Sequence, residues 1–194
     1  MQITSTQLKE LRDKTGISVM QCKKALEEAE GDMDKAVIIL KRKRSEAADK
    51  KSDREIGAGA VGVYAHNTHE VAAMVLLGCE TDFVSKNDEF VALAKDIAMH
   101  VAALNPPFIQ RAEVSEAVLK KAEDIFRAEV ADKPTEMQDK IVAGKMSSYF
   151  KDQVLVEQSF IKNPDTTIGE MITGAVQKFG ENVTIVAVQR LSVR

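Results

Sequence analysis

The first 45 residues combine helix-capping residues with apolar side chains at helical spacing. Thr4–Gln7 and Ser18–Gln21 fit capping boxes, and Asp32 is suited to begin a third segment. Gly16 and Gly31 are placed to end the first two segments. Apolar residues recur three and four positions apart within the segments: Leu8, Leu11; Cys22, Ala25, Leu26, Ala29; Met33, Ala36, Val37, Leu40. The pattern predicts a three-helix module, near the lower size limit for independent folding.

The segment that follows the module lacks an apolar stripe. Ser45–Lys51 is polar but rich in helix-forming residues, so the third helix is expected to run on and fray there. Because no apolar face ties the segment to a core, we expect a flexible linker over residues 46–57.

Strand patterns begin after this linker. Ala60–His66 and Glu70–Cys79 predict two strands, which Asn67–His69 joins as a hairpin. Val71–Leu77 is apolar on both faces, which is typical of a central strand. Val183–Val193 predicts a third strand.

Helical patterns fill the stretch between the hairpin and the third strand. We expect helices over residues 86–103, about 115–131, 134–150 and 168–179. Because the helices are grouped between strands and do not alternate with them, the order favours an α+β fold with a three-stranded antiparallel sheet. The predicted organisation is a three-helix domain (1–45), a linker (46–57) and an α+β core (58–194).

Charge and composition narrow the possible functions. The chain has 27 Lys and Arg against 30 Asp and Glu, and a net charge of −3 disfavours a general nucleic-acid binder. Cys22 and Cys79 cannot build a disulfide framework, and we expect both to be small buried side chains. No apolar run reaches the roughly 20 residues of a membrane helix, and no signal sequence is evident. We therefore expect a cytoplasmic protein.

Basic residues concentrate in Lys41–Arg54, which holds seven Lys and Arg against three acidic residues. A solvated helix end and linker is the simpler interpretation. The alternative is an RNA-associated module, whose binding would depend strongly on salt concentration. A third alternative, an enzyme with an unrecognised pocket, has no sequence motif in its favour.

Two patterns resemble ligand-binding motifs but lack the required context. Gly57–Gly62 matches G-x-G-x-x-G, yet the dinucleotide fingerprint lies between a strand and a helix, whereas a linker precedes this run and a strand follows it. We expect these glycines to give a flexible linker and a close approach of backbones. His66 and His69 lack a third metal ligand, and His100 lies on the helix that carries the Ile97 and Val101 stripe, where a structural histidine is expected.

Two apolar side chains do not fit the predicted cores. Met20 lies on the side of its helix opposite the apolar stripe. Phe83 follows Thr81 and Asp82 in a connector that does not require a large aromatic residue. Exposed Met and Phe side chains are typical of protein-binding surfaces. Alternatively, Met20 packs against the second domain and Phe83 covers the core.

Both positions lie in motifs that resemble those of the elongation factor Ts family. The family's N-terminal motif is similar to Leu11–Gly16 followed by Val19–Leu26, and its second motif is similar to Cys79–Asn87. Further similar stretches, at Ala98–Ala103 with Pro107–Ile109 and at Leu155–Phe160, extend the resemblance over nearly the whole chain.

The resemblance implies a nucleotide exchange factor for the GTPase elongation factor Tu, which is not an enzyme and needs no cofactor or metal. The factor is implied to disturb the magnesium and phosphate site of the GTPase and to hold its nucleotide-free form until GTP binds. The N-terminal domain is implied to be similar to ubiquitin-associated domains. The residues implied to contact the GTPase are Thr81, Asp82, Phe83 and Val84 at the magnesium end of the nucleotide site, Arg12, Val19, Met20 and Lys23 in the N-terminal domain, and His66 near the phosphate-binding loop.

The chain also departs from longer members of the family. Those members have two core subdomains and a projecting coiled-coil insertion, whereas this chain has one core, and we expect no such insertion. His66 and the Thr81–Phe83 element fall on a single hairpin, although longer members divide them between subdomains. We therefore predict a homodimer that forms a 2:2 complex with elongation factor Tu. No direct contact with nucleic acid or a membrane is expected.

Overall fold

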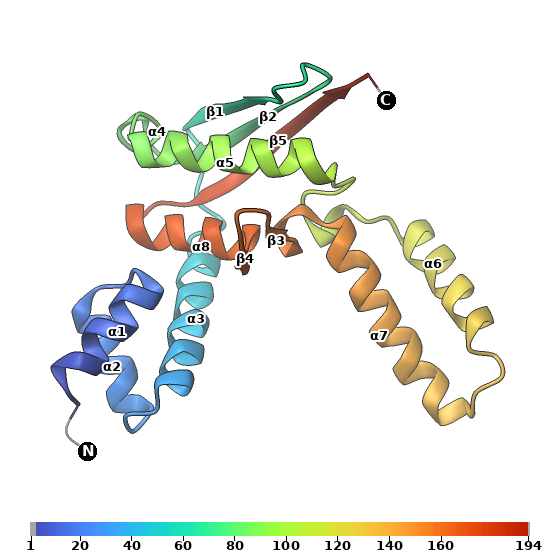
Figure 1. The fold of residues 1–194 in the computed structure, drawn as a ribbon, viewed down its shortest axis with the longest axis horizontal. Helices are drawn as coiled ribbons and strands as arrows, with labels where there is room; N and C mark the ends of the chain where they lie inside the picture. The colour runs from blue at the N-terminus through green and yellow to red at the C-terminus, as the bar shows by residue number, and fades with distance from the viewer. Residues whose placement is uncertain (1–2, 194) are drawn as a thin grey trace.

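The structure is a computed structural model that describes residues 3–193, apart from the side chain of Glu136. A three-stranded sheet, helix α5 (Asp88–Leu104) and helix α8 (Ile168–Phe179) form successive layers (Figure 1). A three-helix module contacts α8, and a two-helix hairpin extends from the other side of the core. The predicted α+β class with a three-stranded antiparallel sheet is confirmed.

The N-terminal module consists of α1 (Ser5–Thr15), α2 (Val19–Glu28) and α3 (Met33–Asp49). Thr4 begins α1 with a full capping box, whereas Ser18 begins α2 with only the serine half of the predicted box. The predicted stripes meet in one small core, whose buried members are Leu11, Ile17, Cys22, Ala25, Leu26, Ala29, Ala36 and Leu40.

Helix α3 continues into the segment predicted as linker, and polar contacts tie it to α8. Arg44 donates hydrogen bonds to the Thr15 carbonyl at 3.0 Å and to Gln177 Oε1 at 2.9 Å. Lys41 pairs with Glu170 at 2.7 Å. Within residues 46–57, the expectation of flexibility overlooked the hydrogen bonds from the Asn182 side chain to the carbonyls of Ser52 and Arg54, because Asn182 lies more than 100 positions away in the sequence. The domain boundaries stay predictions.

Strand β2 (Val71–Cys79) lies between β1 (Ala58–Ala65) and β5 (Val183–Ser192), and both neighbours are antiparallel to it. The predicted central position of this strand is confirmed. Its side chains on the α5 side are buried: Ala73, Val75, Leu77 and Cys79. The register of β2 and β5 shifts between Leu76 and Leu77.

Helix α5 is buried on two sides because the sheet packs against one face and α8 against the other. Four members of the predicted stripe are buried, namely Phe90, Ala94, Ile97 and Val101. Ala98, His100 and Ala102 are buried as well, outside the stripe. A one-sided stripe was predicted because the sequence does not show that a second layer covers the helix.

Short elements that were not predicted join these layers. Helix α4 (Asp82–Ser85) connects β2 to α5, and the strands β3 (Ser159–Phe160) and β4 (Asn163–Thr167) form a small hairpin before α8. Single turns of 3-10 helix span Arg111–Glu113 and Leu155–Glu157. Segments of two to five residues are too short to show a hydrophobic period.

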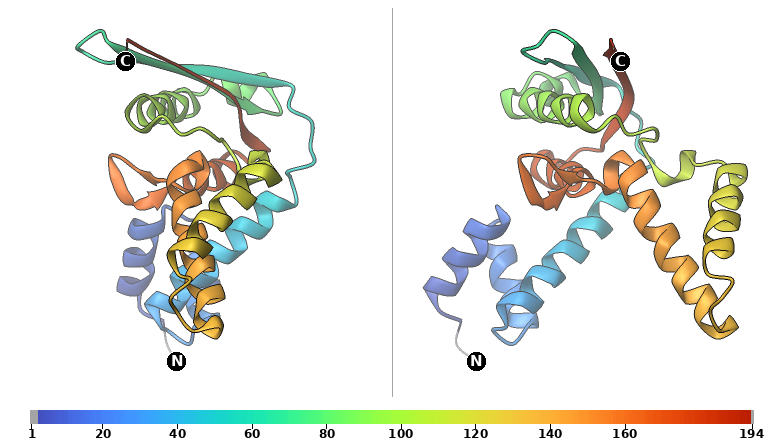
Figure 2. Two further views of the ribbon diagram at one scale, coloured as in Figure 1. Left: turned by 90° about the vertical axis from the view of Figure 1, so that its right-hand side faces the viewer. Right: turned by 45° about the vertical axis from the view of Figure 1, so that its right-hand side comes forward.

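Helices α6 (Glu116–Glu129) and α7 (Thr135–Gln153) form a hairpin that projects from the core (Figures 1 and 2). The expectation that the chain lacks a projecting helical insertion is therefore wrong. A separate small core holds the hairpin together, with Val114, Ala122, Phe150 and Val154 buried. Pro134, which we expected to be the first residue of the helix, is the N-cap residue of α7.

The face of the sheet that points away from α5 is apolar and exposed. Val61, Val63, Met74, Val186 and Leu191 are between 44% and 64% exposed. Val61, Val63 and Met74 alternate along β1 and β2 with side chains that face α5, and Val186 and Leu191 lie on the neighbouring strand β5. These five residues are called here the outer sheet face. Figure 1 shows no helix over this face in the described part of the chain. An apolar surface of this kind is typical of an interaction site.

The close contact between β1 and α5 requires a glycine at position 62. A Cβ atom on Gly62 would lie 2.1 Å from the Ala94 carbonyl carbon and 2.4 Å from the Lys95 nitrogen. The prediction that this glycine run allows a close backbone approach is confirmed. We expect Gly62→Ala to lower the free energy of unfolding by about 1–3 kcal/mol, measured by urea unfolding, because strand and helix must separate.

Gly144→Ala in α7 is the matched control for this substitution. Nothing lies within 4 Å of a Cβ atom added at Gly144. Alanine favours a helix over glycine by roughly 1 kcal/mol, so Gly144→Ala should stabilise the protein. Equal losses of stability in both variants would contradict the proposed close contact.

His100 is a buried, neutral structural histidine, as predicted. Its Nε2 lies 2.8 Å from Gln158 Oε1, and its Nδ1 accepts a hydrogen bond from the Ile161 N–H. Burial lowers the pKa of His100, and the bond to Gln158 opposes this only in part. Because the folded-state pKa lies below the unfolded value, the stability contributed by neutral His100 is present above the unfolded pKa and is lost as pH falls below about 6.5.

Urea unfolding at pH 7.5 and pH 5.5 tests this pH dependence. We expect the wild type to be less stable at pH 5.5, and His100→Asn to lose most of the difference whatever its absolute stability. His69→Asn is the control, since His69 is exposed and has a φ of 59° that asparagine tolerates. An unchanged pH dependence in His100→Asn would assign the effect to other groups.

Candidate functional site

A short tip connects β2 to α5, and Phe83 projects from it. Thr81 is the N-cap residue of α4, and Phe83 lies in the single turn of this helix. The Phe83 side chain is 84% exposed, which excludes the alternative that it covers the core. A large aromatic side chain held in water on an ordered segment is available for insertion into a partner.

Asp82 places a negative charge beside this aromatic ring. Its Oδ2 accepts a hydrogen bond from Lys86 Nζ at 2.6 Å, one helical turn further on. This hydrogen bond and the charge of Lys86 lower the pKa of the Asp82 carboxyl. The tip therefore presents an ionised carboxylate and an aromatic side chain together at neutral pH.

Val84 differs from its predicted role in partner contact. It is only 3% exposed and packs in the main core with Cys79 and Phe90. Successive side chains on a helical turn point in different directions, so Val84 points into the core while Phe83 points into solvent. Val84 therefore anchors the tip to the core. Cys79 is also buried, as predicted, and its thiol donates to the Thr81 carbonyl at 3.2 Å. Burial raises the pKa of this thiol and keeps it protonated as a donor.

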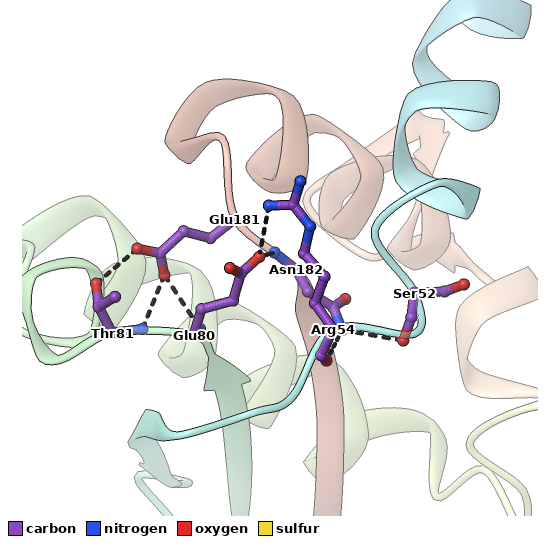
Figure 3. A network of polar contacts seen from close by, with 6 residues as sticks. All are labelled: Ser52, Arg54, Glu80, Thr81, Glu181 and Asn182. Atoms are coloured by element: carbon purple, nitrogen blue, oxygen red, sulfur yellow. Dashed lines mark hydrogen bonds and ion pairs between the residues drawn. The ribbon is translucent and has the colours of Figure 1, made fainter.

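A polar network behind the tip joins three distant segments (Figure 3). Glu80 Oε1 accepts hydrogen bonds from the Asn182 N–H and from Arg54. Its pKa is lowered chiefly by the Asn182 bond and further by Arg54. The Asn182 amide donates to the carbonyls of Ser52 and Arg54 at 3.1 and 2.9 Å. The network ties the segment after α3 to the tip and to the turn between α8 and β5.

Sequence reasoning missed Asn182 and its neighbour Glu181, which also belongs to this network. The only local signal was a polar pair directly after Gly180, the residue that ends α8. Such a pair marks a turn but does not indicate which backbone groups it binds.

The predicted contact residues of the N-terminal module all lie on its surface. Arg12, Val19, Met20 and Lys23 are exposed, and Met20 is 70% exposed. The alternative that Met20 packs against the second domain is therefore excluded. Figure 1 shows α1, α2 and α4 on the same side of the molecule, opposite the α6–α7 hairpin.

His66 lies at the other end of the sheet. It is exposed at the hairpin turn, and the Tyr64 hydroxyl is 3.1 Å from its Nδ1. Strand β2 has nine residues and separates the turn from the tip, a length of about 30 Å. The fold therefore does not bring His66 and Phe83 of one chain together.

Other kinds of site find little support within residues 3–193. No group of three or more His, Cys, Asp or Glu residues in this range is arranged to hold a metal ion. No helix in it is long and apolar enough to cross a membrane. Lys41, Arg42, Lys43 and Arg44 of the basic run contact Glu170, Glu28 or Gln177, which weakens the RNA-binding alternative.

Comparison with known proteins identifies the family of the chain. A family model described as Elongation factor TS matches residues 38–194. The elongation factor Ts of Carboxydothermus hydrogenoformans is 45% identical over 185 residues, or 94% of this chain and 85% of that protein. That of Thermodesulfovibrio yellowstonii is 45% identical over 95% of this chain and 93% of its own length. The Herpetosiphon aurantiacus protein is 42% identical over 100% and 98%. The chain belongs to the elongation factor Ts family.

Proposed function

We propose that this chain performs its family's activity, nucleotide exchange on elongation factor Tu during translation elongation, by inserting the Phe83 tip beside the magnesium end of the GTPase's nucleotide site. The observation that carries the proposal is the 84% exposure of Phe83 on an ordered tip. The activity makes and breaks no covalent bond, so the chain is an exchange factor and not an enzyme. Because translation elongation is a cytoplasmic process, we place its activity in the cytoplasm.

Phe83 supplies the apolar part of the insertion. Burial of a phenylalanine side chain that was in water contributes roughly 1.5–3 kcal/mol. The pocket that accepts it must open among apolar side chains of the GTPase, and this separation disturbs the groups packed beside the nucleotide. Binding energy is therefore converted into weaker GDP binding. The coupling is reciprocal, so GDP weakens the binding of the exchange factor to the GTPase to the same extent.

Asp82 supplies the charged part. An ionised carboxylate competes for the polar groups that support Mg²⁺, and Mg²⁺ bridges phosphate oxygens of the nucleotide. Loss of that support loosens the phosphates without direct contact between Asp82 and GDP. Thr81 orients the tip from its N-cap position.

Arg12, Val19, Met20 and Lys23 form a second surface, which grips the GTPase independently of its nucleotide. The bonds of Arg44 to Thr15 and Gln177 hold this surface at a fixed place relative to the tip. When one surface has bound, the other is present at high effective concentration.

The outer sheet face supports the proposed homodimer. Two copies that pack these faces together would form a sandwich with sheets about 10 Å apart. A two-fold axis across the strands would place the His66 end of one copy over the tip of the other. His66 of one chain and Phe83 of its partner would then reach one GTPase near its phosphate-binding loop and magnesium site, which gives a 2:2 complex.

Release of a fluorescent GDP analogue from elongation factor Tu, in excess unlabelled GDP, tests the tip mechanism. We expect the wild type to accelerate release strongly and Phe83→Ala to lower the maximal rate at least about tenfold, as for an interface hot spot. Met20→Ala should raise the half-saturating concentration with little change in the maximal rate, because that contact does not depend on the nucleotide.

Ile125→Ala is the control, because Ile125 is 51% exposed on α6, outside both surfaces. It should leave exchange unchanged. Full acceleration by Phe83→Ala would move the mechanism to other contacts. No acceleration by the folded wild type at saturating concentration would refute exchange activity.

Sedimentation at micromolar concentration tests the homodimer. We expect a dimer for the wild type and a monomer for Met74→Glu, because a charge on the central strand cannot be buried between two sheets without a partner. Ile125→Glu places the same charge on the hairpin and should stay dimeric. A wild-type monomer with full exchange activity would contradict the dimer.

A further inference from the structure

The carboxylate of Glu181, in the turn between α8 and β5, holds the residues immediately before the tip (Figure 3). Its Oε2 accepts hydrogen bonds from the backbone N–H groups of Glu80 at 3.1 Å and Thr81 at 3.0 Å. Its Oε1 accepts a third bond from the Thr81 hydroxyl at 2.6 Å. Hydrogen bonds to an ionised acceptor are stronger than neutral ones. Thr81 is therefore fixed through both its backbone and its side chain.

Helix α4 depends on outside contacts because it has only four residues. A single helical turn is unfavourable alone, since several dihedral angles are fixed for one hydrogen bond. Its N-cap residue, Thr81, makes no side-chain bond to the helix, and the Thr81 hydroxyl donates to Glu181. Val84 anchors the turn in the core, and Glu181 fixes where it starts. Together they set the direction of Phe83.

The turn that carries Glu181 is itself anchored. The N–H of Asn182 donates to Glu80 Oε1 at 2.5 Å, so Glu80 and the turn exchange hydrogen bonds in both directions. The Asn182 side chain then ties the turn to the carbonyls of Ser52 and Arg54. The carboxylate is thus presented by a rigid support, as a positioning group requires.

We infer that Glu181 is a positioning residue for nucleotide exchange, acting through Phe83 by holding Glu80 and Thr81 in place. The inference rests on the proposed function of the tip. A side chain already held in its inserting direction loses less freedom on binding, and a small misplacement is costly. Glu181 therefore affects how well the tip opens the nucleotide site, and the grip of the N-terminal module is independent of it.

The GDP-release assay separates these two effects. We expect Glu181→Ala to lower the maximal rate about tenfold and to change the half-saturating concentration less than about twofold. Glu181→Gln keeps an acceptor oxygen for the backbone and should restore most of the rate. Glu113→Ala is the matched control: its carboxylate also accepts a backbone N–H, from Ile109 at 2.8 Å, in the segment before α6. It should leave the rate unchanged.

Hydrogen–deuterium exchange of the free protein provides a readout that does not depend on the partner. Glu181→Ala should raise deuterium uptake in residues 80–86 and leave α5 unchanged. In the release assay, Glu181→Ala added to Phe83→Ala should cause no further loss, because the side chain through which it acts is already gone.

Three results would overturn a proposal, and they are distinguishable. Wild-type exchange in Glu181→Ala, with Phe83→Ala defective, refutes the role of Glu181 and leaves the proposed function intact. Raised deuterium uptake throughout the core of Glu181→Ala means that Glu181 stabilises the whole fold, and this result also refutes its positioning role. Normal exchange in Phe83→Ala refutes the tip mechanism itself.

Discussion

The burial of α5 between the sheet and α8 is the constraint on which the other features depend. Strand β1 approaches the α5 backbone so closely that only glycine fits at position 62. The sheet therefore buries one face against α5 and leaves the outer sheet face exposed. The chain must also leave β2 and enter α5 within a few residues, and this reversal pushes Phe83 out into solvent. One packing arrangement thus accounts for both the exposed tip and the proposed dimer surface.

Polar contacts fix the orientation of the tip and the placement of the N-terminal module, which apolar packing alone does not determine. The tip has one buried anchor, Val84, so its orientation depends on hydrogen bonds from the turn between α8 and β5. The N-terminal module has its own small core, so its placement depends on Arg44 and Lys41 at α8. Helix α8 therefore holds the N-terminal module, and the turn that follows it holds the tip.

Much of the fold and part of the site were readable from local patterns. Capping residues and apolar spacing predicted the helices of the N-terminal module, and the two apolar faces of Val71–Leu77 predicted a central strand. Met20 and Phe83 were found because they broke those patterns. Short elements such as α4 were missed, because one turn shows no period. Val84 was grouped with the tip because sequence adjacency does not reveal which way a side chain points.

The sequence by itself determined the type of each long element, the apolar faces and the two side chains without a place in a core. These properties follow from the periods of 3.6 and 2 residues, which act over neighbouring positions. The tertiary structure alone decided that Glu181 holds Thr81 across 100 positions, and that Arg44 reaches Gln177 across 133. It also decided that His66 and Phe83 lie at opposite ends of β2. Such pairings depend on how the layers pack, and no local pattern records them.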